Sequence, residues 1–118
     1  MDRELRYEIK PISPEIAIFD LSGDMNIYNA NKLGEDFEKQ VKQGVKNFIV
    51  NLKNLVMIDS AGIGVLFTML STVQSLDGQA ILLSANQNIR KLFDVTQVST
   101  YFVMMNSEAD ALAKIRGG

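Results

Sequence analysis

The sequence predicts one α/β domain, spanning residues 1–118, with a mixed, mostly parallel sheet of about five strands and four helices. The length of 118 residues is usual for a single domain. Apolar residues recur with period two in some stretches and with helical spacing in others, in the order β-β-α-β-α-β-α-β-α. Strands that alternate with helices need right-handed crossovers and therefore pair in parallel, here after one antiparallel hairpin at the beginning.

The first two strands are expected to form that hairpin. Apolar and charged residues alternate over residues 5–10, which is typical of a strand with one face in water near a sheet edge. Residues 11–14 contain two prolines, which cannot donate to a strand ladder, so we expect a short loop there. A second strand follows over residues 16–21, and the sequence Ser22-Gly23-Asp24 is expected to end it.

The first helix is predicted from about Ile27, where the spacing of the apolar residues changes. They fall on one helical face: Ala30, Leu33, Phe37 and Val41. Gly44 has the residue type and position that end such a helix. The run Phe48-Ile49-Val50 is continuous and apolar, as in a strand buried on both faces, so we expect it at the centre of the sheet.

The alternation continues in the second half of the chain. A helix is predicted over residues 60–76, followed by a turn at Asp77-Gly78 and a buried strand over residues 80–83. Asn86 can cap a short helix after that strand, and residues 96–100 are predicted to be a polar connection.

The chain is expected to end with a short strand and a helix. The strand is predicted over residues 102–105, and Ser107 with the acidic residues after it resembles the start of a capped helix. The last two residues, Gly117 and Gly118, are expected to fray.

Composition excludes several classes of function. With 47% hydrophobic and 22% charged residues, the chain has the values of an ordinary globular protein, and no apolar run is long enough for a membrane span. The acidic start does not resemble a signal peptide, so we expect a cytoplasmic protein. A net charge of −2 without charged blocks disfavours nucleic-acid binding. The absence of cysteine and histidine removes thiol chemistry, thiolate metal sites and the usual general base.

The junction between the predicted central strand and the next helix carries the most informative residues. Asp59 and Ser60 are residue types that begin helices, and Ala61, Gly62 and Gly64 add almost no side-chain bulk over the first turn. Free backbone N–H groups and the positive end of the helix dipole are therefore open to a docking molecule. A serine hydroxyl at such a helix start is well placed to carry a phosphate.

A second segment is expected at the same edge of the sheet. The carboxyl ends of parallel strands meet at one edge, so residues 22–25 should lie close to Asp59 and Ser60. Asp20, Asp24 and Asp59 could hold a divalent ion if they converged, although turn and loop roles suit the same residue types.

The apolar residues near this edge allow two interpretations. Met25, Ile27 and Tyr28 follow the predicted turn, and they fit either partner contact or packing at the helix start. By contrast, Met57, Met69 and Met104 lie in apolar patterns and are interpreted as core residues.

The octapeptide Asp59-Ser60-Ala61-Gly62-Ile63-Gly64-Val65-Leu66 carries a family resemblance. Together with the run Phe48-Ile49-Val50-Asn51-Leu52 before it and Arg90-Lys91-Leu92-Phe93-Asp94 after it, it resembles the STAS domain of bacterial anti-sigma factor antagonists over nearly the whole chain. The resemblance implies that Ser60 is phosphorylated by a partner that is both a serine kinase and an anti-sigma factor. It also implies that the unmodified protein binds this partner and frees the sigma factor, and that a PP2C-type phosphatase restores it.

The resemblance makes this protein the substrate of a kinase, not an enzyme, and implies no cofactor. The expected partner-binding residues are Asp24, Met25, Asn26, Asp59, Ser60, Ala61, Gly62, Ile63 and Gly64. One departure is that many relatives carry Gly-Glu-Leu-Asp where this chain has Gly23-Asp24-Met25-Asn26. The alternatives are a STAS scaffold in a stress-signalling complex or an accessory subunit of a lipid-transport complex, both without a phospho-switch. A small-molecule-binding STAS module is a third possibility.

Overall fold

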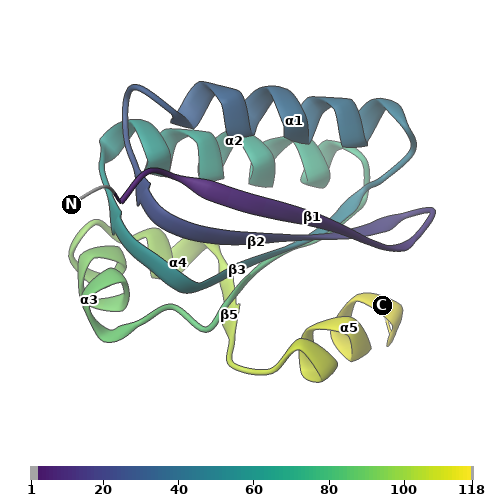
Figure 1. The fold of residues 1–118 in the computed structure, drawn as a ribbon. Coiled ribbons are helices and arrows are strands. Elements are labelled where there is room, and N and C mark those ends of the chain that lie inside the picture. Colours follow the sequence, from purple (N-terminus) through teal and green to yellow (C-terminus); the bar gives the residue numbers. More distant parts are fainter. Residues whose placement is uncertain (1–2, 118) are drawn as a thin grey trace.

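The computed structural model describes residues 3–117, which contain one sheet of five strands and five helices (Figure 1). The strands are β1 (Arg6–Ser13), β2 (Ile16–Met25), β3 (Asn47–Ile58), β4 (Ala80–Leu83) and β5 (Val103–Met105). The helices are α1 (Ala30–Lys42), α2 (Ser60–Ser75), α3 (Gln87–Val95), α4 (Val98–Tyr101) and α5 (Glu108–Gly117). The predicted α/β class is confirmed.

The strand order is β1-β2-β3-β4-β5, with β3 at the centre as predicted. β1 pairs antiparallel with β2, and the remaining neighbours pair in parallel. The sheet is therefore mixed and mostly parallel, and the predicted hairpin at its beginning is confirmed.

The expected loop over residues 11–14 is wrong, because β1 continues through Pro11, which lies opposite Ala17 in β2. β1 is an edge strand, and one side of an edge strand pairs with no other strand. A proline whose nitrogen faces that side therefore costs no hydrogen bond of the sheet. The turn of the hairpin is shorter than expected and consists of Pro14 and Glu15.

The expected break at residues 22–24 is also wrong, and it changes the shape of the site. β2 runs on to Met25 and β3 to Ile58, with Met25 opposite Ile58. Residues 22–24 instead cause two irregularities in the register, and Gly23 has a φ of 88°. A Cβ on Gly23 would lie 2.3 Å from the carbonyl oxygen of Glu4. The backbone at Glu4 can therefore lie this close to position 23 only because that residue is a glycine.

The helices differ from prediction at three points. α1 begins at Ala30, three residues after Ile27, whereas its predicted end at Gly44 is confirmed by a φ of 102° there. Residues 96–100 are not only a connection, because Val98 is fully buried and begins the short helix α4. Gly117 is the last residue of α5, and Gly118 lies outside the described residues.

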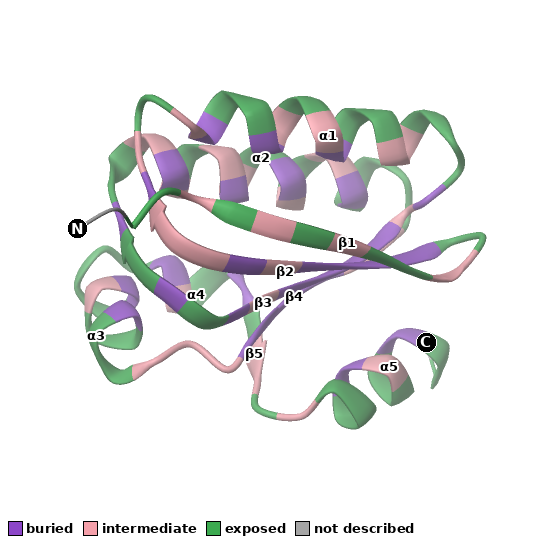
Figure 2. Ribbon diagram, in the orientation of Figure 1, coloured by how far each residue is buried: buried purple, intermediate pink, exposed green. Residues whose placement is uncertain are grey.

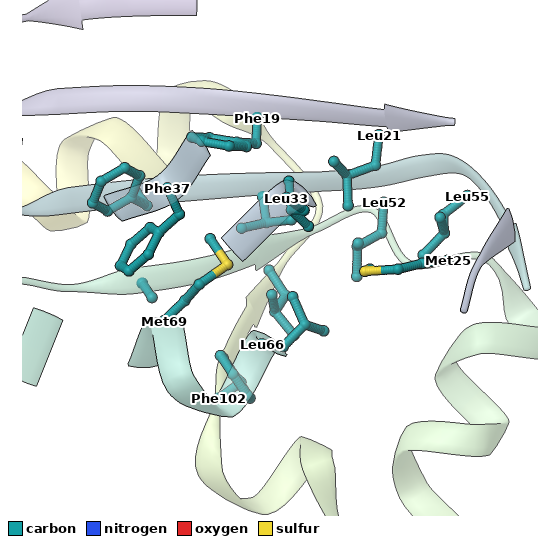
Figure 3. Packing of buried hydrophobic residues seen from close by; sticks show 14 of the residues in the cluster. Phe19, Leu21, Met25, Leu33, Phe37, Leu52, Leu55, Leu66, Met69 and Phe102 are labelled. Atoms are coloured by element: carbon teal, nitrogen blue, oxygen red, sulfur yellow. The ribbon is translucent and has the colours of Figure 1, made fainter. Parts of the chain in front are cut away.

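The larger core lies between the sheet and the helices α1 and α2 (Figures 2 and 3). Phe48 of β3 packs between two other rings, with centroids 4.7 Å from Phe37 of α1 and 5.9 Å from Phe19 of β2. The opposite face of the sheet carries a smaller cluster, to which α5 contributes Ala111 and Ile115. Two helices therefore hold β2 and β3 from one side and fix their carboxyl ends.

Candidate functional site

Asp59 joins the two segments that the sequence predicts at one edge of the sheet. Its Oδ1 accepts hydrogen bonds from the backbone N–H groups of Ala61 at 3.0 Å and Gly62 at 3.1 Å, which makes it the N-cap of α2. Its Oδ2 accepts from the N–H of Ile27 at 3.1 Å, and its own N–H donates to the carbonyl of Met25 at 3.0 Å. Of residues 22–25, which the sequence predicts close to Asp59, Met25 contacts it directly, whereas Ser22 and Gly23 lie further back, opposite Asn54 and Leu55 of β3.

Ser60 is exposed and is the first residue of α2. Because Asp59 supplies the capping carboxylate, the Ser60 hydroxyl is not the cap, and it makes no hydrogen bond with the described residues 3–117. The first turn of α2 contains no acidic residue, and the N-cap Asp59 offsets the positive end of the helix dipole. A negative group on Ser60 can therefore be accommodated without breaking a contact of the fold.

The turn between β2 and α1 is fixed by asparagine side chains. Asn29 accepts from the N–H of Asn26 at 2.9 Å and donates to the carbonyl of Asp24 at 2.9 Å. Asn26 in turn accepts from the N–H of Tyr28 at 2.9 Å. Ile27 and Tyr28 project outward from this turn and are 67% and 94% exposed, so neither packs at the helix start.

Three expected roles of apolar or small residues are wrong. The side chain of Met25 is 1% exposed and lies among the core residues of Figure 3, so it cannot contact a partner. Gly62 is buried, and a Cβ there would lie 2.6 Å from Ile58 and 3.0 Å from Met25. Gly62 is thus required for packing of α2 on the strands and does not line a surface. Met57, interpreted as a core residue, is 54% exposed.

The other expected contact residues lie at or near the surface. Asn26, Ala61 and Ile63 are half-buried, and Gly64 is exposed, with no atom within 4 Å of the position of a Cβ. Together with Asp24, Asp59 and Ser60 they form what we call the Ser60 surface, made of residues Asp24, Asn26, Asp59, Ser60, Ala61, Ile63 and Gly64. Figure 1 shows the β2–α1 turn beside the start of α2, at the end of the sheet where β2 and β3 finish.

Arg3 is a residue of the site that the sequence pattern does not reveal. Its Nε donates to Asp24 Oδ2 at 3.2 Å, and its carbonyl accepts from the N–H of Asp24 at 2.8 Å. Asp24 Oδ1 is buried without a hydrogen-bond partner in the described part of the chain. Arg3 precedes the first strand, and no motif or periodicity connects it with Asp24.

The carboxylates do not form an ion site. Asp20 binds Lys10 Nζ at 2.6 Å and Asn51 Nδ2 at 2.5 Å, whereas Asp24 and Asp59 are engaged by the contacts described above. No group of three or more acidic or other metal-binding side chains is placed to hold an ion within residues 3–117. Over the same residues, none of the helices combines the length and apolar character needed to span a bilayer.

Residues 7–111 match the sequence model of the STAS domain, so the chain belongs to the STAS domain family. It is similar to the anti-sigma F factor antagonist of Lysinibacillus sphaericus, with 23% identity over 114 residues that cover 96% of this chain and 97% of that protein.

Solved structures of the antagonist SpoIIAA share the fold. The unphosphorylated form aligns with a TM-score of 0.85 and 21% identity over 96% of this chain and 98% of that one. The phosphorylated form from Bacillus aligns with a TM-score of 0.75 and 20% identity over 93% and 99%. The fold that carries the Ser60 surface is thus shared with a protein solved in both phosphorylation states.

Proposed function

We propose that this protein is an anti-sigma factor antagonist that works by partner switching. In its unphosphorylated form it binds an anti-sigma factor that is also a serine kinase, and the sigma factor is released. The kinase phosphorylates Ser60, the complex dissociates, and a PP2C-type phosphatase restores the antagonist. The protein is a substrate and a binding partner in this cycle, not a catalyst.

The observation that carries the proposal is the division of roles between Asp59 and Ser60. Asp59 caps α2 and holds the β2–α1 turn, so the exposed hydroxyl of Ser60 is free to be modified. A phosphate adds about −1.5 to −2 charges at pH 7, and the positive end of the α2 dipole favours a negative charge there. The name of the Lysinibacillus relative and the two forms of SpoIIAA support the same role.

The same phosphate is unfavourable in a complex. A partner that covers Ser60 would remove the phosphate from water, and the loss of screening by water would strengthen its repulsion from the carboxylate of Asp59, next in the chain. Each 1.4 kcal/mol of that penalty weakens binding about tenfold, so about 3 kcal/mol is enough to dissociate a complex of ordinary affinity. The fold is retained while the complex is lost.

Phosphorylation of the purified protein tests the proposal. Incubation with ATP and the anti-sigma factor kinases of the source genome, each purified, is expected to add one phosphate, located on Ser60 by mass spectrometry. Ser60→Ala is expected to accept none, whereas Ser107→Ala, at the start of α5, is expected to be modified like the unaltered protein. A phosphate on another residue, or a stable stoichiometric complex without phosphoserine, would contradict the proposal and favour a STAS scaffold.

Binding measurements test the switch itself. Ser60→Asp is expected to bind the kinase about 100-fold more weakly than the unaltered protein, as measured by titration calorimetry. Its thermal unfolding temperature is expected to stay nearly unchanged, because the Ser60 side chain makes no contact on which the fold depends. Equal affinity of Ser60→Asp and the unaltered protein would exclude the switch.

A further inference from the structure

The β2–α1 turn presents two large apolar side chains that the fold itself does not use. Ile27 is 67% exposed and Tyr28 is 94% exposed, the highest value among the exposed large hydrophobic residues of the described chain. Met57, 54% exposed, lies opposite Asp24 in the β2–β3 ladder, two residues before Asp59. Exposed apolar groups that gather beside a polar surface mark sites of protein contact.

The backbone of this turn is held firmly, although its side chains are free. The N–H of Ile27 donates to Asp59 and that of Tyr28 to Asn26, while Asn29 closes the turn from the other side. The Cα–Cβ bonds of Ile27 and Tyr28 therefore leave the turn in a fixed direction. A preorganised contact loses less conformational entropy on binding than a flexible one, and tyrosine is among the residues that most often dominate interfaces.

The turn is continuous with the Ser60 surface through one side chain. Asp59 accepts the hydrogen bond from Ile27, caps α2 and immediately precedes Ser60. A partner that covers Ser60 thus reaches Ile27 and Tyr28 with the same face. Asp24 is already paired with Arg3, so the exposed carboxylate of Asp59 is the negative group left beside the turn. A complementary partner therefore carries a cationic side chain beside an apolar recess.

We propose that Ile27 and Tyr28 form an apolar anchor that docks the anti-sigma factor kinase, in a cleft of the kinase that is apolar inside and basic at its edge. The inference rests on the proposed function and assigns a separate task to each part of the surface. Ser60 carries the chemical signal, while the anchor supplies affinity that does not depend on the reacting hydroxyl.

Steady-state phosphorylation by the kinase that modifies the unaltered protein tests the anchor. Ile27→Ser and Tyr28→Ser are each expected to raise KM at least tenfold and to leave kcat within about twofold, because docking is weakened and the hydroxyl is unchanged. Val95→Ser, which removes a side chain 77% exposed on α3, is the matched control and is expected to leave both constants unchanged. Equal thermal unfolding temperatures exclude a folding effect.

The outcomes separate this inference from the proposed function. If Ser60 is phosphorylated and both turn variants keep the unaltered KM, the anchor is wrong and the proposed function stands. If Val95→Ser raises KM as much as Tyr28→Ser, the rise in KM comes from the loss of any exposed apolar side chain, and the anchor is again wrong. If no anti-sigma factor kinase modifies Ser60, the proposed function fails and the anchor fails with it.

Discussion

At the scale of single residues, Asp59 determines the geometry of the site because one carboxylate serves two segments. It accepts two hydrogen bonds from the start of α2 and one from the β2–α1 turn. The side chain of Ser60, the next residue, makes no hydrogen bond with either segment. Replacing Asp59 should therefore lower the stability of the fold, whereas replacing Ser60 should leave stability unchanged and affect function.

Asp59→Ala is expected to lower the free energy of unfolding by about 1–2 kcal/mol, because the helix loses its cap and the turn loses its acceptor. Ser60→Ala is the matched control and is expected to change it by less than about 0.5 kcal/mol. Urea denaturation of both variants measures the difference. An equal loss in the two variants would show that the cap is not supplied by Asp59.

The two glycines near the start of α2 should respond in opposite directions to replacement by alanine. Gly62→Ala is expected to cost about 1–3 kcal/mol, because its Cβ would lie 2.6 Å from Ile58. Gly64→Ala is expected to stabilise by about 0.4–1 kcal/mol, since a Cβ there meets no atom within 4 Å and the unfolded chain loses freedom. Urea denaturation compares them, and equal effects would contradict the packing described for Gly62.

The sequence predicts part of the site at this scale. Asp59 and Ser60 can be found because their residue types mark a helix start. The burial of Met25 and Gly62 cannot, since it depends on how far β2 and β3 extend. Arg3 cannot be found either, because only the folded chain brings it to Asp24.

At the scale of elements, β1 is joined to α1 by Tyr7 and Asp36. The Tyr7 hydroxyl donates to Asp36 Oδ2 at 2.5 Å, and Lys32 Nζ lies 3.1 Å from the other carboxylate oxygen. Burial, followed by the bond to Asp36, raises the pKa of Tyr7 well above its usual range. The bond from Tyr7, with Lys32 and Lys39 adding to it, lowers the pKa of Asp36.

These pKa shifts predict a pH window for the stability supplied by the pair. Asp36, whose pKa is lower in the folded state, contributes fully above about pH 4, and its contribution falls as pH drops through the folded pKa. Tyr7, whose pKa is higher in the folded state, contributes fully below about pH 10, and its contribution falls at higher pH.

Tyr7→Phe should therefore differ from the unaltered protein by a constant free energy of unfolding between about pH 5 and pH 9. The difference should shrink below about pH 4 and above about pH 10. Urea denaturation over this pH range measures it, with Tyr101→Phe, on the short helix α4, as the control. A difference that does not depend on pH down to pH 2 would exclude the coupling.

Sequence patterns identify the longer elements better than their ends. The strand at Phe48-Ile49-Val50 and the helix from Ser60 are confirmed because long apolar patterns specify them. The extension of β2 and β3 is missed because Ser22, Gly23 and Asp24 are residue types that usually form turns. In this fold they lie within β2, where the pairing with β3 is irregular. α4 is missed because its four residues depend on the burial of Val98.

At the scale of the whole molecule, the two faces of the sheet bury unequal cores. α1 and α2 cover the larger one, whereas α5 packs on the smaller cluster of the other face. Amide hydrogen exchange is expected to be slowest in β2 and β3 and faster in α5, because few buried residues hold that helix. Exchange in α5 as slow as in β3 would show that the two cores open together.

The firm turn between β2 and α1 also bears on how such regulators diverge. Its geometry depends on Asn26, Asn29 and Asp59, whereas the side chains of Ile27 and Tyr28 are exposed and do not pack in the core. Exposed positions of this kind usually accept substitution with little change in stability. If Ile27 and Tyr28 dock the partner as proposed, a change of two neighbouring codons is enough to alter recognition in a duplicated gene, while each copy keeps its scaffold.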